Sequence, residues 1–165
     1  DLDRTWQCST IQLDMALPER FDLEYTTKDG NSKRPIMLHR VVYGAIERFI
    51  GIITEHLNGK FPLWLSPVQV KVLTITDQNI PFAKEVIEKL QKANLRVELD
   101  DQSESMGKKV KDALNEKVNY IITIGDKEVE KKMLAVRDRS GKTSFDVDIT
   151  EFIQKLVDEI KERVV

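Results

Sequence analysis

Residues 6–13 alternate between side chains that face opposite ways in an extended chain, which predicts a β-strand. Gln7 falls on one predicted face. The other face carries small or polar side chains after its first residue, which is unusual for a core and suits the wall of a pocket. Its members are Trp6, Cys8, Thr10 and Gln12.

Two more strands and a helix are predicted before residue 60. Residues 21–26 and 34–38 have strand character, and the turn residues at 28–31 would join them into a hairpin. Residues 45–57 place apolar side chains at helical spacing, and Asn58-Gly59 is typical of a helix end. The apolar positions are Ile46, Phe49, Ile50 and Ile53.

Residues 61–67 mark a change in this pattern. They contain two prolines and no long periodicity, which predicts a boundary between domains. They are also apolar, so we expect a packed connector rather than a free linker. The predicted domains are therefore residues 1–60 and 61–165.

Apolar strand-like runs and amphipathic helices alternate beyond this boundary. A strand–helix–strand–helix–strand order predicts parallel pairing with right-handed crossovers, and a hairpin around Ser140-Gly141 would extend one edge of the sheet. Asp77 is the expected cap of the first helix. The predicted strands are 68–75, 94–99, 120–124, 133–137 and 143–147, and the predicted helices are 77–93, 105–117 and a last one from 150.

Composition narrows the class of protein. With 41% hydrophobic and 33% charged residues, the chain is too apolar to be disordered. It contains no apolar run of the length that a membrane-spanning helix needs, so no membrane partner is expected. Cys8 is the single cysteine, which excludes an internal disulfide framework and indicates a reducing compartment such as the cytoplasm.

The charge is unevenly distributed along the chain. A formal net charge of −2 excludes a uniformly basic nucleic-acid binder. Between Ser105 and Lys142, however, ten Lys or Arg residues accompany six Asp or Glu residues. This local excess suits a polyanionic partner, although charge alone favours an ordinary solvated surface.

Two stretches, residues 4–14 and 35–52, resemble threonyl-tRNA synthetases. Within the second, the segment from Gly44 to Arg48 is similar to motif 3 of class II synthetases, where a strand leads into a helix carrying Glu-Arg. His39, nine residues before Arg48, is similar to the threonyl enzymes specifically.

The resemblance covers essentially the whole chain and continues through residues 64–70, 125–130 and 135–139. Motifs 1 and 2, the other two zinc ligands and an editing domain do not occur in these residues. We therefore expect the chain to be a fragment of such an enzyme or a truncated paralogue.

The resemblance implies a catalytic role for Arg48, as the motif 3 arginine that contacts ATP and stabilises negative charge on the reacting phosphates. From spacing alone, Arg48 would be an ordinary helix residue in a surface salt bridge. The resemblance also implies two groups of binding residues: Gln7, Thr10 and Gly44 for ATP, and Thr10 and Gln12 for threonine.

His39 resembles the third zinc ligand of the family. Zinc with three protein ligands keeps a position open for substrate, and a site built to bind a hydroxyl rejects an analogue that lacks it. Such a site would separate threonine from valine. Without the resemblance a lone histidine is usually a packing or surface residue, as we expect for His56.

The resemblance implies a second set of residues that contact the tRNA anticodon. Glu128 and Arg137 would contact bases, because carboxylates accept hydrogen bonds from base amino groups and arginine donates to bases or stacks on them. Ser103 is a further candidate in a loop that departs from the family pattern. Lys108, with Lys109 and Lys111, would attract the phosphate backbone.

The expected fold class is α/β: the tail of a class II synthetase antiparallel-sheet catalytic domain, followed by a mixed β-sheet anticodon-binding domain. The implied activity is threonine–tRNA ligation with ATP, Mg²⁺ and Zn²⁺, by a parent enzyme that binds threonine and tRNA(Thr) and acts as a homodimer. A non-catalytic RNA-binding paralogue is the alternative. An unrelated α/β protein that binds a small ligand explains neither stretch, and no glycine-rich phosphate loop supports it.

Overall fold

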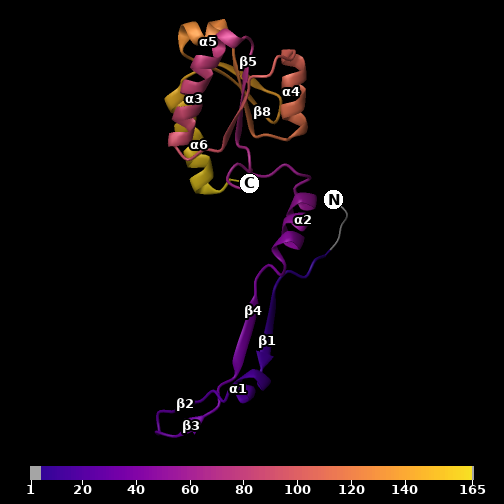
Figure 1. The fold of residues 1–165 in the computed structure, drawn as a ribbon, viewed down its shortest axis with the longest axis vertical. Coiled ribbons are helices and arrows are strands. Elements are labelled where there is room, and N and C mark those ends of the chain that lie inside the picture. The colour runs from indigo at the N-terminus through magenta and orange to yellow at the C-terminus, as the bar shows by residue number, and fades with distance from the viewer. Residues whose placement is uncertain (1–4, 165) are drawn as a thin grey trace. The chain divides into compact units, whose positions relative to one another are not determined.

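The structure, a computed structural model, describes residues 5–164 and divides into two compact units (Figure 1). The first unit ends at Asn58 and the second begins at Gly59. Arg4, part of the first stretch that resembles synthetases, lies outside the described residues. Each unit is described by itself.

The first unit is built on an antiparallel pair of strands, β1 and β4, with Gln12 directly opposite His39. A second, shorter antiparallel pair joins β2 and β3. The elements of the first unit are β1 (Thr10–Asp14), α1 (Ala16–Arg20), β2 (Tyr25–Thr26), β3 (Ser32–Lys33), β4 (Met37–Val41) and α2 (Ile46–His56).

Three predictions for this unit are wrong. The strand predicted over residues 6–13 begins only at Thr10. The segment predicted as a strand at 34–38 does not pair with 21–26, because β4 takes β1 as its partner and β2 closes on β3. Helix α1 was not predicted, since Pro18 indicated a break, but proline is tolerated in a first helical turn.

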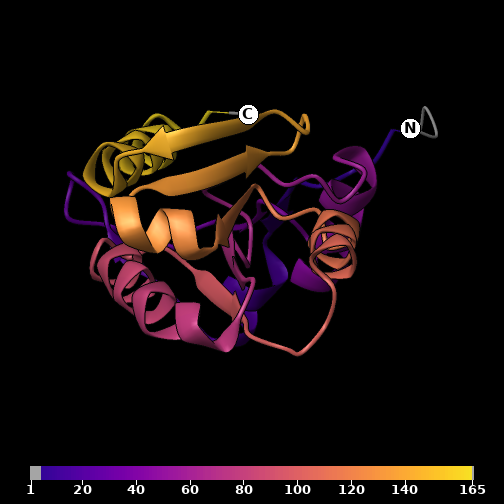
Figure 2. The ribbon, with the colours of Figure 1, turned by 90° about the horizontal axis from the view of Figure 1, so that it is seen from above.

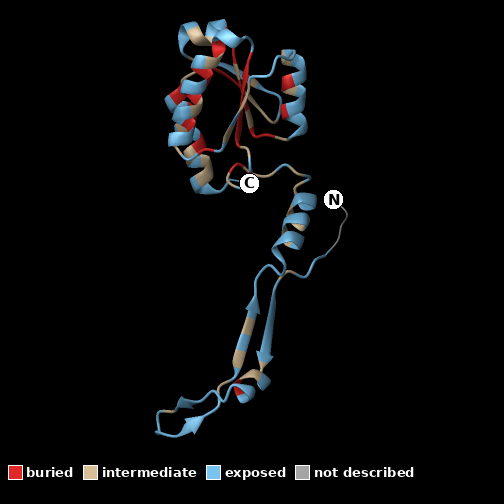
Figure 3. Cartoon of the chain, in the orientation of Figure 1, coloured by how far each residue is buried: buried red, intermediate tan, exposed pale blue. Residues whose placement is uncertain are grey.

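The apolar side chains of the first unit lie mostly at its surface. Ile11, Leu13 and Leu38 are 70%, 63% and 64% exposed, and Pro18 alone is buried among the unit's described residues (Figure 3). This unit therefore has no hydrophobic core of its own.

The second unit is a five-stranded mixed sheet in the order β6-β5-β7-β8-β9. β5 pairs in parallel with β6 and β7, and β8 and β9 follow antiparallel at one edge, which confirms the predicted mixed α/β fold. Its elements are β5 (Val70–Thr74), η1 (Asp77–Asn79), α3 (Ile80–Lys92), β6 (Val97–Asp100), α4 (Met106–Asn115), β7 (Tyr120–Ile124), α5 (Asp126–Lys131), β8 (Leu134–Asp138), β9 (Thr143–Val147) and α6 (Ile149–Glu162).

The helices form layers on both faces of this sheet. α3 and α6 cover one face and bury the larger part of the core, while α4 covers β5 on the other face (Figures 1 and 2). Val70 and Val72 of β5 are fully buried, as expected for a central parallel strand covered on both sides. Each such side chain contributes about 1.5–3 kcal/mol through burial.

The ends of the helices depend on local hydrogen bonds that the pattern did not reveal. Thr76, and not Asp77, begins the first helical segment, because its backbone N–H donates to Asn79 Oδ1 at 3.1 Å. The short helix α5 was not predicted. Asp148 caps α6 by accepting from the backbone N–H groups of Thr150 and Glu151.

The connector at residues 61–67 is packed onto the second unit, as its apolar composition predicted. Leu63 is 1% exposed. Arg96 donates to the Ser66 and Trp64 carbonyl oxygens at 2.8 and 3.0 Å, and Gln69 Nε2 donates to the Leu63 carbonyl oxygen at 2.8 Å. The connector therefore belongs to the anchored framework of this unit.

Candidate functional site

One face of the β1–β4 ladder gathers polar side chains. Thr10, Gln12 and Asp14 alternate along β1 and so share a face, and His39 shares it because it pairs with Gln12 across the ladder. The structure thus brings the predicted threonine-contacting residues together with the predicted metal ligand.

Asp14 orients His39. Asp14 Oδ2 lies 2.9 Å from His39 Nε2, and Oδ1 accepts from the backbone N–H groups of Ala16 and Leu17 at 2.9 and 3.0 Å. The pKa of Asp14 is lowered by the Leu17 N–H and then by the His39 ring, so the carboxylate stays ionised. A carboxylate on one ring nitrogen fixes the imidazole and points the other nitrogen toward a ligand.

Arg48 lies with Gln7, Thr10 and Gly44 in a second cluster. Its Nη2 donates to the Gln7 carbonyl oxygen at 2.7 Å, and Gln7 Nε2 donates to Thr10 Oγ1 at 2.9 Å. Gly44 has a φ of +73°, and a Cβ there would lie 3.5 Å from Arg48 Nη1. The guanidinium carbon of Arg48 also lies 5.7 Å from the centre of the Trp6 ring.

This arrangement corrects the prediction that Gln7 faces away from Thr10. Residues 5–9 do not form a strand, so strict alternation does not apply to them. The loop turns the Gln7 side chain back toward Thr10 and presents its carbonyl to Arg48.

One residue of each cluster was missed in the sequence: Asp14 beside His39 and Trp6 beside Arg48. Asp14 was detectable, because it lies two positions after Gln12 and therefore on the same strand face. Trp6 was assigned to a strand face, and only the fold places it beside Arg48.

Metal binding needs more ligands than these residues supply. Among the residues that the structure describes, no three His, Cys, Asp or Glu side chains gather in a way that could hold a metal ion. His39, oriented by the Asp14 carboxylate, could supply one ligand of a larger metal-binding set.

Within the same described residues, no helix is long and apolar enough to cross a membrane.

In the second unit, Ser103 lies in the exposed loop after β6. The loop lines a cavity of about 380 Å³, together with Thr74 at the end of β5, Thr76 at the start of η1, and Lys109. The carboxyl ends of parallel strands meet at one edge of a sheet, which is a common place for ligands in α/β folds.

Lys109 is unavailable as a surface charge, contrary to prediction. It is 4% exposed, and its Nζ donates to the carbonyl oxygens of Thr74 and Asp100 at 3.0 and 3.2 Å. The side chain ties the ends of β5 and β6 together beneath the Ser103 loop. Lys108 is exposed but forms an ion pair with Glu104.

Glu128 lies at the start of α5, beyond the end of β7. Its Oε2 accepts from the Gly125 backbone N–H at 3.0 Å, so the carboxylate caps the helix. An added Cβ at Gly125 would lie 2.6 Å from Ile75 Cδ1, so the Ile75 side chain would have to shift to admit it. One carboxylate oxygen of Glu128 is therefore occupied by the hydrogen bond that caps α5.

Arg137 lies on β8, opposite Ile121 on one side and Thr143 on the other. Ile121 faces α4, so the partly exposed Arg137 side chain rises from the same sheet face. Because Arg137 pairs near the start of β7 and Glu128 follows its end, the two residues lie at different levels of the sheet. The structure does not bring them into contact.

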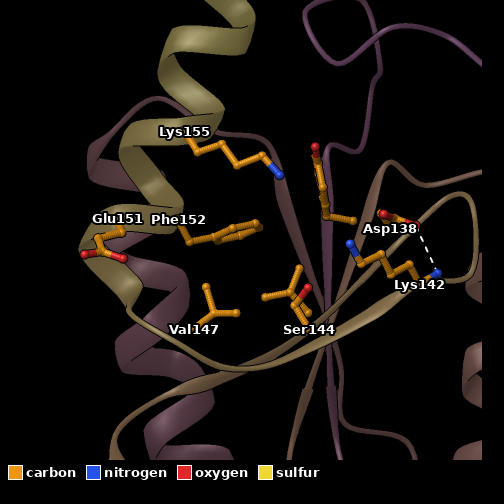
Figure 4. Close-up of a pocket in the computed structure, with 9 residues that line it drawn as sticks. Asp138, Lys142, Ser144, Val147, Glu151, Phe152 and Lys155 are labelled. Carbon is orange, nitrogen blue, oxygen red and sulfur yellow. Dashed lines mark hydrogen bonds between the residues drawn. The ribbon is translucent and has the colours of Figure 1, made fainter.

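The opposite face holds a separate groove between the β8–β9 hairpin and α6 (Figure 4). Its volume is about 250 Å³, and its walls include Val136, Ser144 and Phe152. Tyr120 packs edge-on against Phe152, with ring centres 5.5 Å apart, and its hydroxyl donates to Glu159 Oε2 at 2.8 Å. These contacts belong to the packing of α6.

Residues 69–159 match the family model described as "Anticodon binding domain". The chain belongs to this family. Residues 1–57 match a second model, described as "tRNA synthetase class II core domain (G, H, P, S and T)", so features of two synthetase domains follow one another in the chain.

Curated relatives extend the match across both units. A threonine–tRNA ligase of Chlamydia pneumoniae is 52% identical over 96% of this chain and 25% of its own length. Another from Desulforamulus reducens is 49% identical over 99% of this chain and 26% of its own length. The chain spans about a quarter of these relatives, and the resemblance to threonyl-tRNA synthetases is confirmed.

Solved structures of aminoacyl-tRNA synthetases show the same similarity. The RNA-binding domain of threonyl-tRNA synthetase from Cryptosporidium parvum superposes with a TM-score of 0.84 at 35% identity, over 96% of this chain and 40% of that one. Prolyl-tRNA synthetase of the same organism, complexed with halofuginone and AMPPNP, gives 0.74 at 26% identity, over 95% and 35% of the two chains. The match to a class II core does not favour a paralogue that keeps only the anticodon-binding fold.

Proposed function

We propose that this chain supplies part of the active site and the anticodon-recognition domain of a threonine–tRNA ligase. The single observation that carries the proposal is the sequence identity of about 50% to such ligases, which extends across both units. The parent enzyme would join threonine to ATP as threonyl-adenylate, releasing pyrophosphate, and then transfer the threonyl group to tRNA(Thr). The cytoplasm as compartment and a homodimeric parent enzyme are proposed on the resemblance alone.

Arg48 is the proposed catalytic residue of this chain. Class II synthetases use ATP with Mg²⁺, and the carboxylate of the amino acid attacks the α-phosphate. A guanidinium held against the Gln7 carbonyl and the Trp6 ring is already oriented, so it can stabilise charge on the phosphates without reorganising. Gly44 approaches the guanidinium closely, and Thr10 fixes the Gln7 amide.

His39 is the proposed zinc ligand, and Gln12 with Thr10 would line the threonine pocket. The Asp14 carboxylate holds one imidazole nitrogen of His39, which leaves the other for the metal. When bound, zinc would coordinate the substrate hydroxyl and so separate threonine from valine. The remaining ligands lie outside the cluster described above.

Anticodon recognition is proposed for the second unit. Arg137 is a partly exposed side chain on β8, and Ser103 and Glu128 lie at the carboxyl edge of the sheet. Glu128 keeps one carboxylate oxygen for a base donor. Lys108 would have to exchange Glu104 for a phosphate, which reduces its contribution.

A chimera tests the catalytic part of the proposal. This chain would replace the aligned segment of the Chlamydia pneumoniae ligase, and threonine-dependent ATP–pyrophosphate exchange would be measured. We expect activity within about tenfold of the relative, and Arg48→Ala to lower it by about 10²–10³-fold. Arg40→Ala is the matched control, because Arg40 pairs with Ile11 on the other face of the ladder.

A folded but inactive chimera would contradict the proposed function. Loss of activity in Arg48→Ala by less than about threefold, or an equal loss in Arg40→Ala, would remove Arg48 from the ATP site.

A further inference from the structure

Phe145 is an aromatic side chain with no evident packing role. It is 70% exposed, the most exposed of the large hydrophobic side chains described in the second unit, and it lies on the edge strand β9. A single exposed apolar side chain is common on protein surfaces, so the significance of Phe145 depends on what shares its sheet face.

A β-bulge determines where Phe145 points. Leu134 pairs with Val147 and Val136 pairs with Ser144, so two residues of β9 lie opposite one residue of β8. Ser144 and Val147 both line the groove against α6. Phe145, between them, faces the other side of the sheet.

Phe145 therefore shares a sheet face with Arg137. It lies two positions beyond Thr143, which pairs directly with Arg137. The neighbouring Asp146 would repel a polyanion, but Lys131 forms an ion pair with it at 2.8 Å. The same sheet face thus carries an aromatic ring and a guanidinium, and the adjacent Asp146 carboxylate is ion-paired.

We propose that Phe145 is a stacking platform for an unpaired base of the RNA loop that Arg137 contacts. This inference rests on the proposed anticodon recognition and names an additional residue for it. Single-stranded RNA is commonly held by aromatic side chains that stack on splayed bases while arginine donates to base edges. The ring would supply affinity and Arg137 would supply base choice.

The test is a titration of the 165-residue chain with a synthetic RNA hairpin that carries a threonine anticodon loop. Phe145→Ala should weaken binding by about tenfold, within the range of roughly 5–150-fold for a lost base stack. Phe145→Trp should bind within about twofold of the unmodified chain, and Phe145→Leu should resemble Phe145→Ala. The salt dependence should not change, because stacking releases no phosphate counterions.

Controls separate stacking from folding and from the proposed function. Leu114→Ala removes another exposed apolar side chain, 41% exposed on α4, and should leave binding unchanged. Circular dichroism checks that each variant folds. Equal binding by Phe145→Leu and Phe145→Trp, or by Phe145→Ala and the unmodified chain, would overturn the stacking role while Arg137→Ala still tests recognition. No hairpin binding by the unmodified chain would overturn both.

Discussion

Replacing Arg139 with Met should destabilise the second unit by about 2–4 kcal/mol, whereas the same change at Arg137 should cost less than about 0.5 kcal/mol. The two arginines are two positions apart, but only Arg139 is built into the framework. Its Nε and Nη2 donate to the Lys117 carbonyl oxygen at 2.9 and 2.6 Å, and its Nη1 donates to the Phe61 carbonyl oxygen at 2.5 Å.

The magnitude follows from these three bonds. A hydrogen bond from a charged donor contributes about 1.5–3 kcal/mol. The loss at Phe61 is partial, because Asn119 Nδ2 and Ser66 Oγ also donate to its carbonyl oxygen, at 3.3 and 3.1 Å. Burial, which lowers the pKa of Arg139, also makes the charged side chain costly to keep, so the net loss is smaller than the sum.

Urea unfolding followed by far-ultraviolet circular dichroism measures this difference in free energy, and thermal unfolding followed by the same signal gives the midpoint temperature. The midpoint temperature of Arg139→Met should fall by roughly 10–20 °C for a domain of this size. Arg137→Met should keep its stability and lose its preference for a threonine anticodon hairpin. If the two variants unfold within about 0.5 kcal/mol of each other, the connector is not held by Arg139 in the way described.

Three further changes test other parts of the molecule. In the ligase chimera, His39→Ala should lose zinc and threonine recognition together, and full zinc occupancy by metal analysis would exclude it as a ligand. Lys108→Ala should weaken cognate and scrambled hairpins equally and flatten the salt slope, and a selective loss would contradict a phosphate role. Burial and Glu159 raise the pKa of Tyr120 above its ordinary value of 10.0, so Tyr120 contributes stability that is present below pH 10.0 and decreases above it. Tyr120→Phe should therefore show a shallower loss of stability in alkaline urea titrations, and parallel curves would contradict this reasoning.

The second unit was largely predictable because burial and chain order act together there. Residues 68–75 and 120–124 are apolar runs that pair in parallel inside a mixed sheet covered on both faces, so their strand character is visible without knowledge of the partners. The helical spacing of Phe152 and Leu156 likewise predicted the buried face of α6. The short helix α5 was missed because its six residues are too few to show a helical period.

In the first unit, the sequence indicated strand-forming segments but not which strands pair with each other. Residues 34–38 look like a hairpin partner of 21–26, but Pro35 cannot donate to a ladder, and β4 bonds to β1 from 23 residues away in the chain. Distant hydrogen bonds decide strand partners, and no local pattern encodes them.

The sequence by itself determined which chemical groups are present: the resemblance pointed to Arg48, His39 and Arg137 by number. Only the tertiary structure decided how they are held. It placed Asp14 on His39, withdrew Lys109 into the sheet and left Phe145 exposed on the sheet face of Arg137. The reason is physical: a side chain's charge is a property of its residue, but its exposure and its partners depend on segments that meet only when the chain folds.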